Sequence, residues 1–187
     1  MSIIALWLPV VVAAVAVFVA SSLIHMVFKW HASDYRPLAN EDEVQAVLRA
    51  GNPTPGQYVL PHCADMAAMQ SEPMLSKYRA GPVGFIQVLP SGDPDMRGSL
   101  VKWFVFNLVV AALAALIAAH VLGHGVSAVE AGHLAAILSF LTYGGGSIQS
   151  GIWMGKRWGS VAKDQLDALI YAAVTGFVFI WLWPTVG

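Results

Sequence analysis

The sequence predicts an all-α membrane protein with four transmembrane helices and a small cytoplasmic α+β cap between helices 1 and 2. Three observations lead to this prediction: the composition, the lengths of the apolar runs and the distribution of the basic residues. Of the 187 residues, 57% are hydrophobic and only 11% are charged, and the mean hydropathy is +0.64. Because soluble domains carry about 25% charged residues, this composition indicates an integral membrane protein.

The apolar runs give the expected domain organisation. A helix needs about 20 apolar residues to cross the bilayer core. No basic residue precedes Lys29, whereas a secretory signal begins with basic residues and has a shorter apolar core, so we expect a retained first helix. The expected parts are transmembrane helix 1 at 1–29, a cap segment at 30–99, and a three-helix transmembrane region at 100–187 with spans near 100–122, 134–153 and 166–183.

The basic residues give the expected orientation. All ten fall into two groups, one in or beside the first connection and one in the third: Lys29, Arg36, Arg49, Lys77, Arg79, Arg97 and Lys102, then Lys156, Arg157 and Lys163. Cytoplasmic loops of membrane proteins carry the excess of Lys and Arg. We therefore expect a bacterial cytoplasmic (inner) membrane protein with connections 1 and 3 in the cytoplasm and both termini in the periplasm.

Local signals predict four short elements in the cap. An Asn followed by three acidic residues, and later a Gly, predicts a helix from Asn40 to Gly51. Ser71 and Pro73 predict the start of a second short helix that ends near Gly81. Runs of β-forming residues bounded by Gly and Pro predict two short strands, Gln57–Leu60 and Val83–Leu89.

Polar residues inside the expected spans form the first candidate site. His25, Asn107, Gln149 and Asp167 fall at similar depth on the cytoplasmic side. Polar groups at membrane depth are unfavourable unless they face the bundle interior. They could bind a quinone head group, a cofactor or a proton, or they could form the hydrogen bonds that hold four helices together.

Histidines on the opposite side are a second candidate site. His120, His124 and His133 surround the second connection and could ligate a metal or hold a haem. At helix ends in a Gly-rich turn they are equally suited to contact with water. A segment with His62, Cys63 and Met66 has soft ligands of the kind that bind Cu(I), but without a repeated pattern. We predict no resident metal or cofactor at these positions.

Small residues recur every four positions at Ser147, Gly151, Gly155 and Gly159. Such spacing predicts a flat helix-packing face, because small side chains let helix backbones approach closely in a bilayer. The neighbour could be another helix of the chain or another subunit.

Several classes of function are disfavoured. A net charge of −1 does not suit a nucleic-acid surface, and the single cysteine, Cys63, excludes an intrachain disulfide. The sequence lacks GxSxG, HExxH, P-loop and GxGxxG motifs, which disfavours the corresponding hydrolases, NTPases and dinucleotide enzymes.

The segments HMVFKWHASDYRPLANEDEV, PGQYVLPHC and GPVGF resemble an uncharacterised family of bacterial four-helix inner-membrane proteins. The resemblance implies a bacterial source and four spans, and no activity.

We therefore expect a non-catalytic integral membrane subunit packed within a larger bacterial membrane complex of the respiratory or photosynthetic type. Its expected partners are the lipid bilayer and other membrane subunits. The alternatives are a cofactor- or metal-binding redox protein, with haem or quinone as the candidate cofactors, and a small enzyme that acts on lipids or quinones through the inner polar cluster.

Overall fold

The computed structural model describes residues 3–123 and 127–184, and 72% of these described residues are helical. The chain divides into two compact units. The helical unit comprises residues 1–35 and 95–187, and the cap comprises residues 36–94. The cap therefore begins and ends a few residues inside the segment 30–99 that the sequence suggested.

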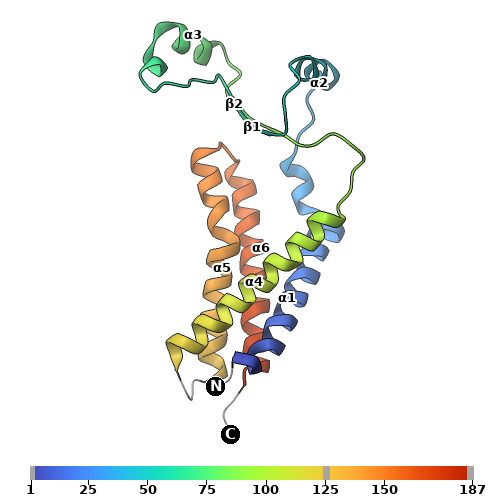
Figure 1. Cartoon of the computed structure of the whole chain (residues 1–187), viewed down its shortest axis with the longest axis vertical. Helices are drawn as coiled ribbons and strands as arrows, with labels where there is room; N and C mark the ends of the chain where they lie inside the picture. Colours follow the sequence, from blue (N-terminus) through green and yellow to red (C-terminus); the bar gives the residue numbers. More distant parts are fainter. Residues whose placement is uncertain (1–2, 124–126, 185–187) are drawn as a thin grey trace. The chain divides into compact units, whose positions relative to one another are not determined.

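Four long helices form the helical unit (Figure 1): α1 (Trp7–Ser22), α4 (Arg97–Leu122), α5 (Ala128–Trp153) and α6 (Trp158–Leu182). A short 3₁₀ helix, Ile3–Leu6, precedes α1. A π-helical segment, Leu23–Phe28, continues α1, and a 3₁₀ helix, Trp30–Asp34, follows it.

Within the described residues, three helices are long and apolar enough to cross a membrane: Trp7–Phe28, α4 and α6. They indicate a membrane-embedded protein. Although α5 also has 26 residues, it is not among them. The run Gly144–Gly146 and the polar residues Ser147, Gln149 and Ser150 dilute its apolar character. The count of three therefore does not confirm the four transmembrane helices that the sequence predicted.

Small residues dominate the core of the helical unit. Its buried members include Ala13, Ala111, Ala114, Ala118, Ala131, Ala135 and Phe179. The closest approach joins α5 to α6, since a Cβ at Gly176 would lie 3.0 Å from the carbonyl oxygen of Gly132. At the other end of the pair, a Cβ at Gly151 would lie 3.1 Å from Val161 Cγ2. The two helices thus pack along nearly their whole length.

The predicted small-residue face is divided by the end of α5. Ser147 and Gly151 lie on α5 and face α6, where Gln165 Nε2 donates to Ser147 Oγ at 2.7 Å. Gly155 lies in the α5–α6 turn with a φ of 69°, and Gly159 lies in the first turn of α6. The four residues therefore do not share one helix face, because the chain reverses direction between them.

The cap contains the four elements that the sequence predicted: α2 (Glu41–Ala50), β1 (Gly56–Leu60), α3 (Glu72–Ala80) and β2 (Gly84–Val88). It also contains a 3₁₀ helix, Ala68–Gln70, which the sequence analysis did not predict. The strands are antiparallel, with Gly56 opposite Val88 and Leu60 opposite Gly84. All residues of the cap are described, and none of them is buried. Strand pairing and local turns therefore hold this unit together in the absence of a closed core.

Candidate functional site

A cluster of charged and aromatic side chains lies where α1 ends. We call it the junction cluster; it consists of His25, Trp30, His31, Asp34, Lys163 and Asp167. His31 is at its centre. Its Nδ1 lies 2.7 Å from Asp34 Oδ2, and its Nε2 lies 2.8 Å from Asp167 Oδ2. An ionised carboxylate can only accept hydrogen bonds, so both ring nitrogens donate when both carboxylates are ionised.

Irregular backbone brings these residues together. After Ser22 the helix widens into the π-helical segment, which carries His25. Lys29 then adopts a left-handed conformation with a φ of 53°, which ends the helix and turns the chain. The following 3₁₀ helix places Trp30, His31 and Asp34 against α6. π-Helical turns occur frequently at functional sites.

Lys163 of α6 fixes this short helix from the other side. Its Nζ donates to the Trp30 carbonyl oxygen, to Ser33 Oγ and to Asp34 Oδ1, each at 2.7 Å. The hydrogen bond from Lys163 is the main cause that holds the pKa of Asp34 well below its usual range. Asp34 is therefore ionised at neutral pH and can orient His31.

Asp167 of α6 is buried, and its carboxylate has two hydrogen-bond partners on the 3₁₀ helix Trp30–Asp34. Trp30 Nε1 donates to its Oδ1 at 3.1 Å, while its Oδ2 faces His31. Its side chain is only 8% exposed. Both carboxylate oxygens are thus occupied, as burial of a charge requires.

A cavity of about 300 Å³ adjoins the junction cluster. Every long helix of the unit except α1 itself lines it, together with the π-helical segment. The lining residues are His25, Trp103 of α4, Tyr143, Ser147 and Ser150 of α5, Lys156 of the α5–α6 turn, and Asp164, Asp167, Ala168 and Tyr171 of α6. Lys156 Nζ donates to Asp164 Oδ2 at 2.5 Å.

Three aromatic rings form one wall of this cavity. The ring centroids of Trp103 and Tyr143 are 5.8 Å apart, those of Tyr143 and Tyr171 5.3 Å, and those of Trp103 and Tyr171 6.4 Å, all in edge-to-face arrangements. Hydrogen bonds hold two of the rings in place. Trp103 Nε1 donates to Ser21 Oγ at 2.9 Å, and the Tyr143 hydroxyl donates to Asn107 Oδ1 at 3.0 Å.

The four residues of the predicted inner cluster have different positions. His25 and Asp167 line the cavity. Asn107 is buried behind Tyr143, and its Nδ2 has no hydrogen-bond partner among the described residues. Gln149 is exposed, and Gln165 of α6 instead donates to Ser147 and to the Gly144 carbonyl.

Sequence reasoning did not identify His31, Asp34, Lys163 or the aromatic wall as site residues. The three-residue spacing of His31 and Asp34 was a usable signal, because it places both side chains on one side of a short helix. Their contacts with Lys163 and Asp167, which lie about 130 positions later in the chain, could not be predicted from the local sequence.

The other candidate metal ligands do not converge in the described residues. His120 and His133 are exposed, and the only group of three or more candidate ligands within the described ranges is His25, His31 and Asp167. His124 lies outside these ranges. In the cap, Cys63 Sγ contacts the Asp65 carbonyl oxygen at 3.0 Å, and Met66 is exposed.

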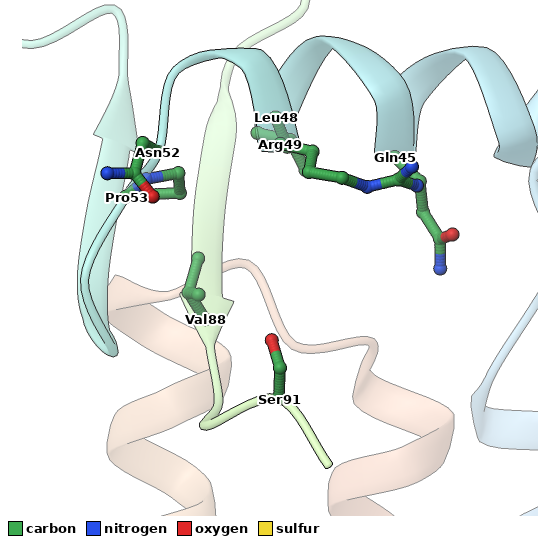
Figure 2. Close-up of a pocket in the computed structure, with 7 residues that line it drawn as sticks. All are labelled: Gln45, Leu48, Arg49, Asn52, Pro53, Val88 and Ser91. Carbon is green, nitrogen blue, oxygen red and sulfur yellow. The ribbon is translucent and has the colours of Figure 1, made fainter.

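A second cavity, of about 380 Å³, lies within the cap (Figure 2). It is lined by Gln45, Leu48, Arg49, Asn52, Pro53, Val88 and Ser91. Arg49 is its one charged lining residue, and the C-terminus of α2, whose carbonyl groups carry partial negative charge, lies beside it. The positive charge of Arg49 and the partial negative charge of the helix end oppose each other, so this cavity favours neither an anion nor a cation.

The chain matches no protein-family model, and comparisons with curated proteins and with solved structures also give no match.

Proposed function

We propose that this chain is a four-span bacterial inner-membrane protein that binds the head group of a quinone-class molecule in the cavity beside the junction cluster. The observation that carries the proposal is the cavity itself: three aromatic rings and polar side chains from three helices surround it.

The length of the α5–α6 contact supports α5 as the fourth span. The turn between the two helices is short, and they pack against each other from Gly151 near the turn to Gly132 and Gly176 near the far end. If α6 crosses the bilayer, α5 lies at the same depth. Ser147 of α5 and Gln165 of α6 form a hydrogen bond with each other. Polar groups within a membrane need such partners, because no water is available there to form hydrogen bonds.

The distribution of basic residues supports the orientation. Lys156, Arg157 and Lys163 lie at one end of the α5–α6 pair, and Lys163 contacts the segment that follows α1. By the positive-inside rule, this end faces the cytoplasm and both termini face the periplasm. The cavity then lies near the cytoplasmic surface of the membrane.

The charges that line the cavity favour a neutral ligand. Asp164 is neutralised by Lys156, and Asp167 has Trp30 and His31 as partners. Neither carboxylate is unpaired, so the cavity lining does not favour an organic cation. The aromatic wall offers ring faces and edges, against which a flat ring packs favourably.

Free hydrogen-bond donors border the cavity. The hydroxyl groups of Ser147 and Ser150 donate to carbonyl groups of their own helix, and Tyr143 donates to Asn107. Lys156 retains further N–H groups, and Tyr171, one helical turn from Asp167 on α6, brings its hydroxyl-bearing ring to the cavity lining. Quinone carbonyl oxygens are acceptors and suit these donors.

Fluorescence quenching tests this proposal. Purified protein in nanodiscs is titrated with decylubiquinone, and we expect saturable quenching of tryptophan fluorescence. Trp103→Phe should remove most of the saturable component, and Tyr171→Phe should weaken binding about tenfold, the effect of one hydrogen bond. Trp158→Phe is the matched control, because this exposed tryptophan does not line the cavity. Quenching that rises linearly and equally in all variants would mean partitioning into lipid and would contradict the proposal.

The interpretation as a non-catalytic subunit of a larger complex stays a prediction. Lipid alone accounts for the exposed apolar faces of the helices. Co-purification and native gel migration after gentle solubilisation test it, and an absorption spectrum tests the haem alternative.

A further inference from the structure

Two imidazoles and one carboxylate converge in the junction cluster. One candidate ligand atom from each of His25, His31 and Asp167 lies within 4.8 Å of the other two. The rings of His25 and His31 meet edge to face with centroids 4.9 Å apart. His25 forms none of the hydrogen bonds that hold the cluster together, so those bonds do not explain its position.

We propose that His25, His31 and Asp167 bind one divalent transition-metal ion of the Zn²⁺ or Fe²⁺ type. Imidazole nitrogen with carboxylate oxygen is a ligand set typical of these ions, whereas Ca²⁺ and Mg²⁺ take oxygen ligands. Three protein ligands leave a coordination position open, and His25 and Asp167 both border the cavity.

The surroundings of the three residues resemble the outer shell of a metal site. Histidine ligands usually donate their second ring N–H to a carboxylate, and carboxylate ligands are themselves hydrogen-bonded. Here His31 Nδ1 faces Asp34 at 2.7 Å, Lys163 holds Asp34, and Trp30 Nε1 donates to Asp167 Oδ1. The remaining ring nitrogen of His31 and the remaining oxygen of Asp167 face each other.

Formal charge also favours a cation. Asp34 and Asp167 contribute two negative charges and Lys163 one positive charge, which leaves an excess of one negative charge when both imidazoles are neutral. Metal ligation requires a neutral imidazole and an ionised carboxylate, so a divalent ion would take the place of the hydrogen bond between His31 Nε2 and Asp167 Oδ2.

Only small movements are needed to close the site. Metal–ligand bonds of about 2.0–2.2 Å place tetrahedral ligand atoms about 3.3 Å apart. His31 and Asp167 are already 2.8 Å apart, so they would separate slightly. His25 is exposed and can rotate towards them.

Zinc binding by the purified full chain, without quinone, tests the inference. After treatment with a chelator, equilibrium dialysis against Zn²⁺ should give one bound ion per chain. His25→Ala should lower the affinity by at least about tenfold, and Asp34→Asn by about 10- to 100-fold. The melting temperature of the metal-free His25→Ala protein should equal that of the wild type, which separates loss of a ligand from loss of structure.

His133→Ala is the control, because it removes another exposed histidine and should leave Zn²⁺ binding unchanged. Absence of stoichiometric zinc in the wild type, or equal affinity in His25→Ala, would overturn the inference and leave His31 as an ion-pair bridge. Because decylubiquinone is absent, neither result depends on the quinone proposal.

Discussion

The two units of this chain use similar polar groups in different surroundings. In the helical unit, the side chains of the His31–Asp167 pair are 17% and 8% exposed. In the cap, the side chains of the Arg79–Glu72 pair are 66% and 71% exposed. Because the first pair is buried, its stability depends on the exact geometry of its hydrogen bonds. The second pair is exposed, so water screens its charges and can form hydrogen bonds with either side chain in place of its partner.

This contrast indicates where the chain can hold a ligand in a fixed arrangement. Buried polar side chains of the helical unit include Ser21, Asn107, Ser139, Ser160, Asp167 and Thr175. Each is positioned by neighbours from other helices or by its own helix. The cap has no buried residue, so water competes for the hydrogen bonds of its polar groups and its cavity is lined by solvent-accessible side chains.

The largest expected effect follows loss of the buried carboxylate. Asp167→Ala leaves His31 Nε2 and Trp30 Nε1 without their acceptor, and we expect a loss of about 3–5 kcal/mol in the free energy of unfolding. Glu72→Ala, which breaks the exposed pair of the cap, should change it by less than about 1 kcal/mol. Denaturant titration of both variants in detergent measures the difference, and equal losses would contradict the contrast between the units.

The second effect concerns the close approach of α5 and α6. In Gly176→Ala the new methyl group would lie 3.0 Å from the Gly132 carbonyl oxygen and 2.9 Å from Ala136 Cβ. We expect a loss of about 1–3 kcal/mol, as for other overpacked sites. Gly145→Ala is the control, because nothing lies within 4 Å of its new methyl group, and Ala is the better helix former by about 1 kcal/mol. Thermal melts of both variants should therefore shift in opposite directions.

A smaller effect is expected at the start of α5, where Ser127 and Glu130 form a capping box. Ser127 Oγ accepts a hydrogen bond from the Glu130 backbone N–H. In return, the backbone N–H and the hydroxyl of Ser127 both donate to the Glu130 carboxylate. These bonds lower the pKa of Glu130 below its ordinary value of 4.5. Their contribution to stability is therefore present above that value and is lost as the pH falls through the lowered pKa. Glu130→Gln should reduce the stability difference between neutral and acidic pH, and Ser127→Ala should cost about 1 kcal/mol at neutral pH. A pH series of melts that is identical in wild type and Glu130→Gln would refute this.

The smallest effect is expected in the cap. The Tyr58 hydroxyl donates to the Thr54 carbonyl oxygen at 2.7 Å on an exposed surface. Tyr58→Phe should change the stability by less than about 0.5 kcal/mol, as is usual for surface substitutions. Hydrogen exchange of the β1–β2 amides should be nearly unchanged; a large increase would show that the cap depends on this contact more than its exposure implies.

Local sequence signals predicted the elements but not their contacts. Apolar runs marked the long helices, and the turn residues around Gln57–Leu60 and Val83–Leu89 marked the two strands. The four-residue spacing grouped Gly155 and Gly159 with Ser147 and Gly151 in one packing face, although α5 ends at Trp153. His31 and Tyr171 gained their roles only from residues distant in sequence, and a single sequence does not record such pairs.

The most direct test of the central claim is photo-crosslinking with a short-chain quinone that carries a photoreactive group. After illumination in nanodiscs, peptides are mapped by mass spectrometry, with unlabelled decylubiquinone as competitor. The account predicts competed labelling in peptides that contain Trp103, Tyr143 or Tyr171. Labelling confined to the cap, or labelling of the helices that the competitor does not reduce, would contradict it.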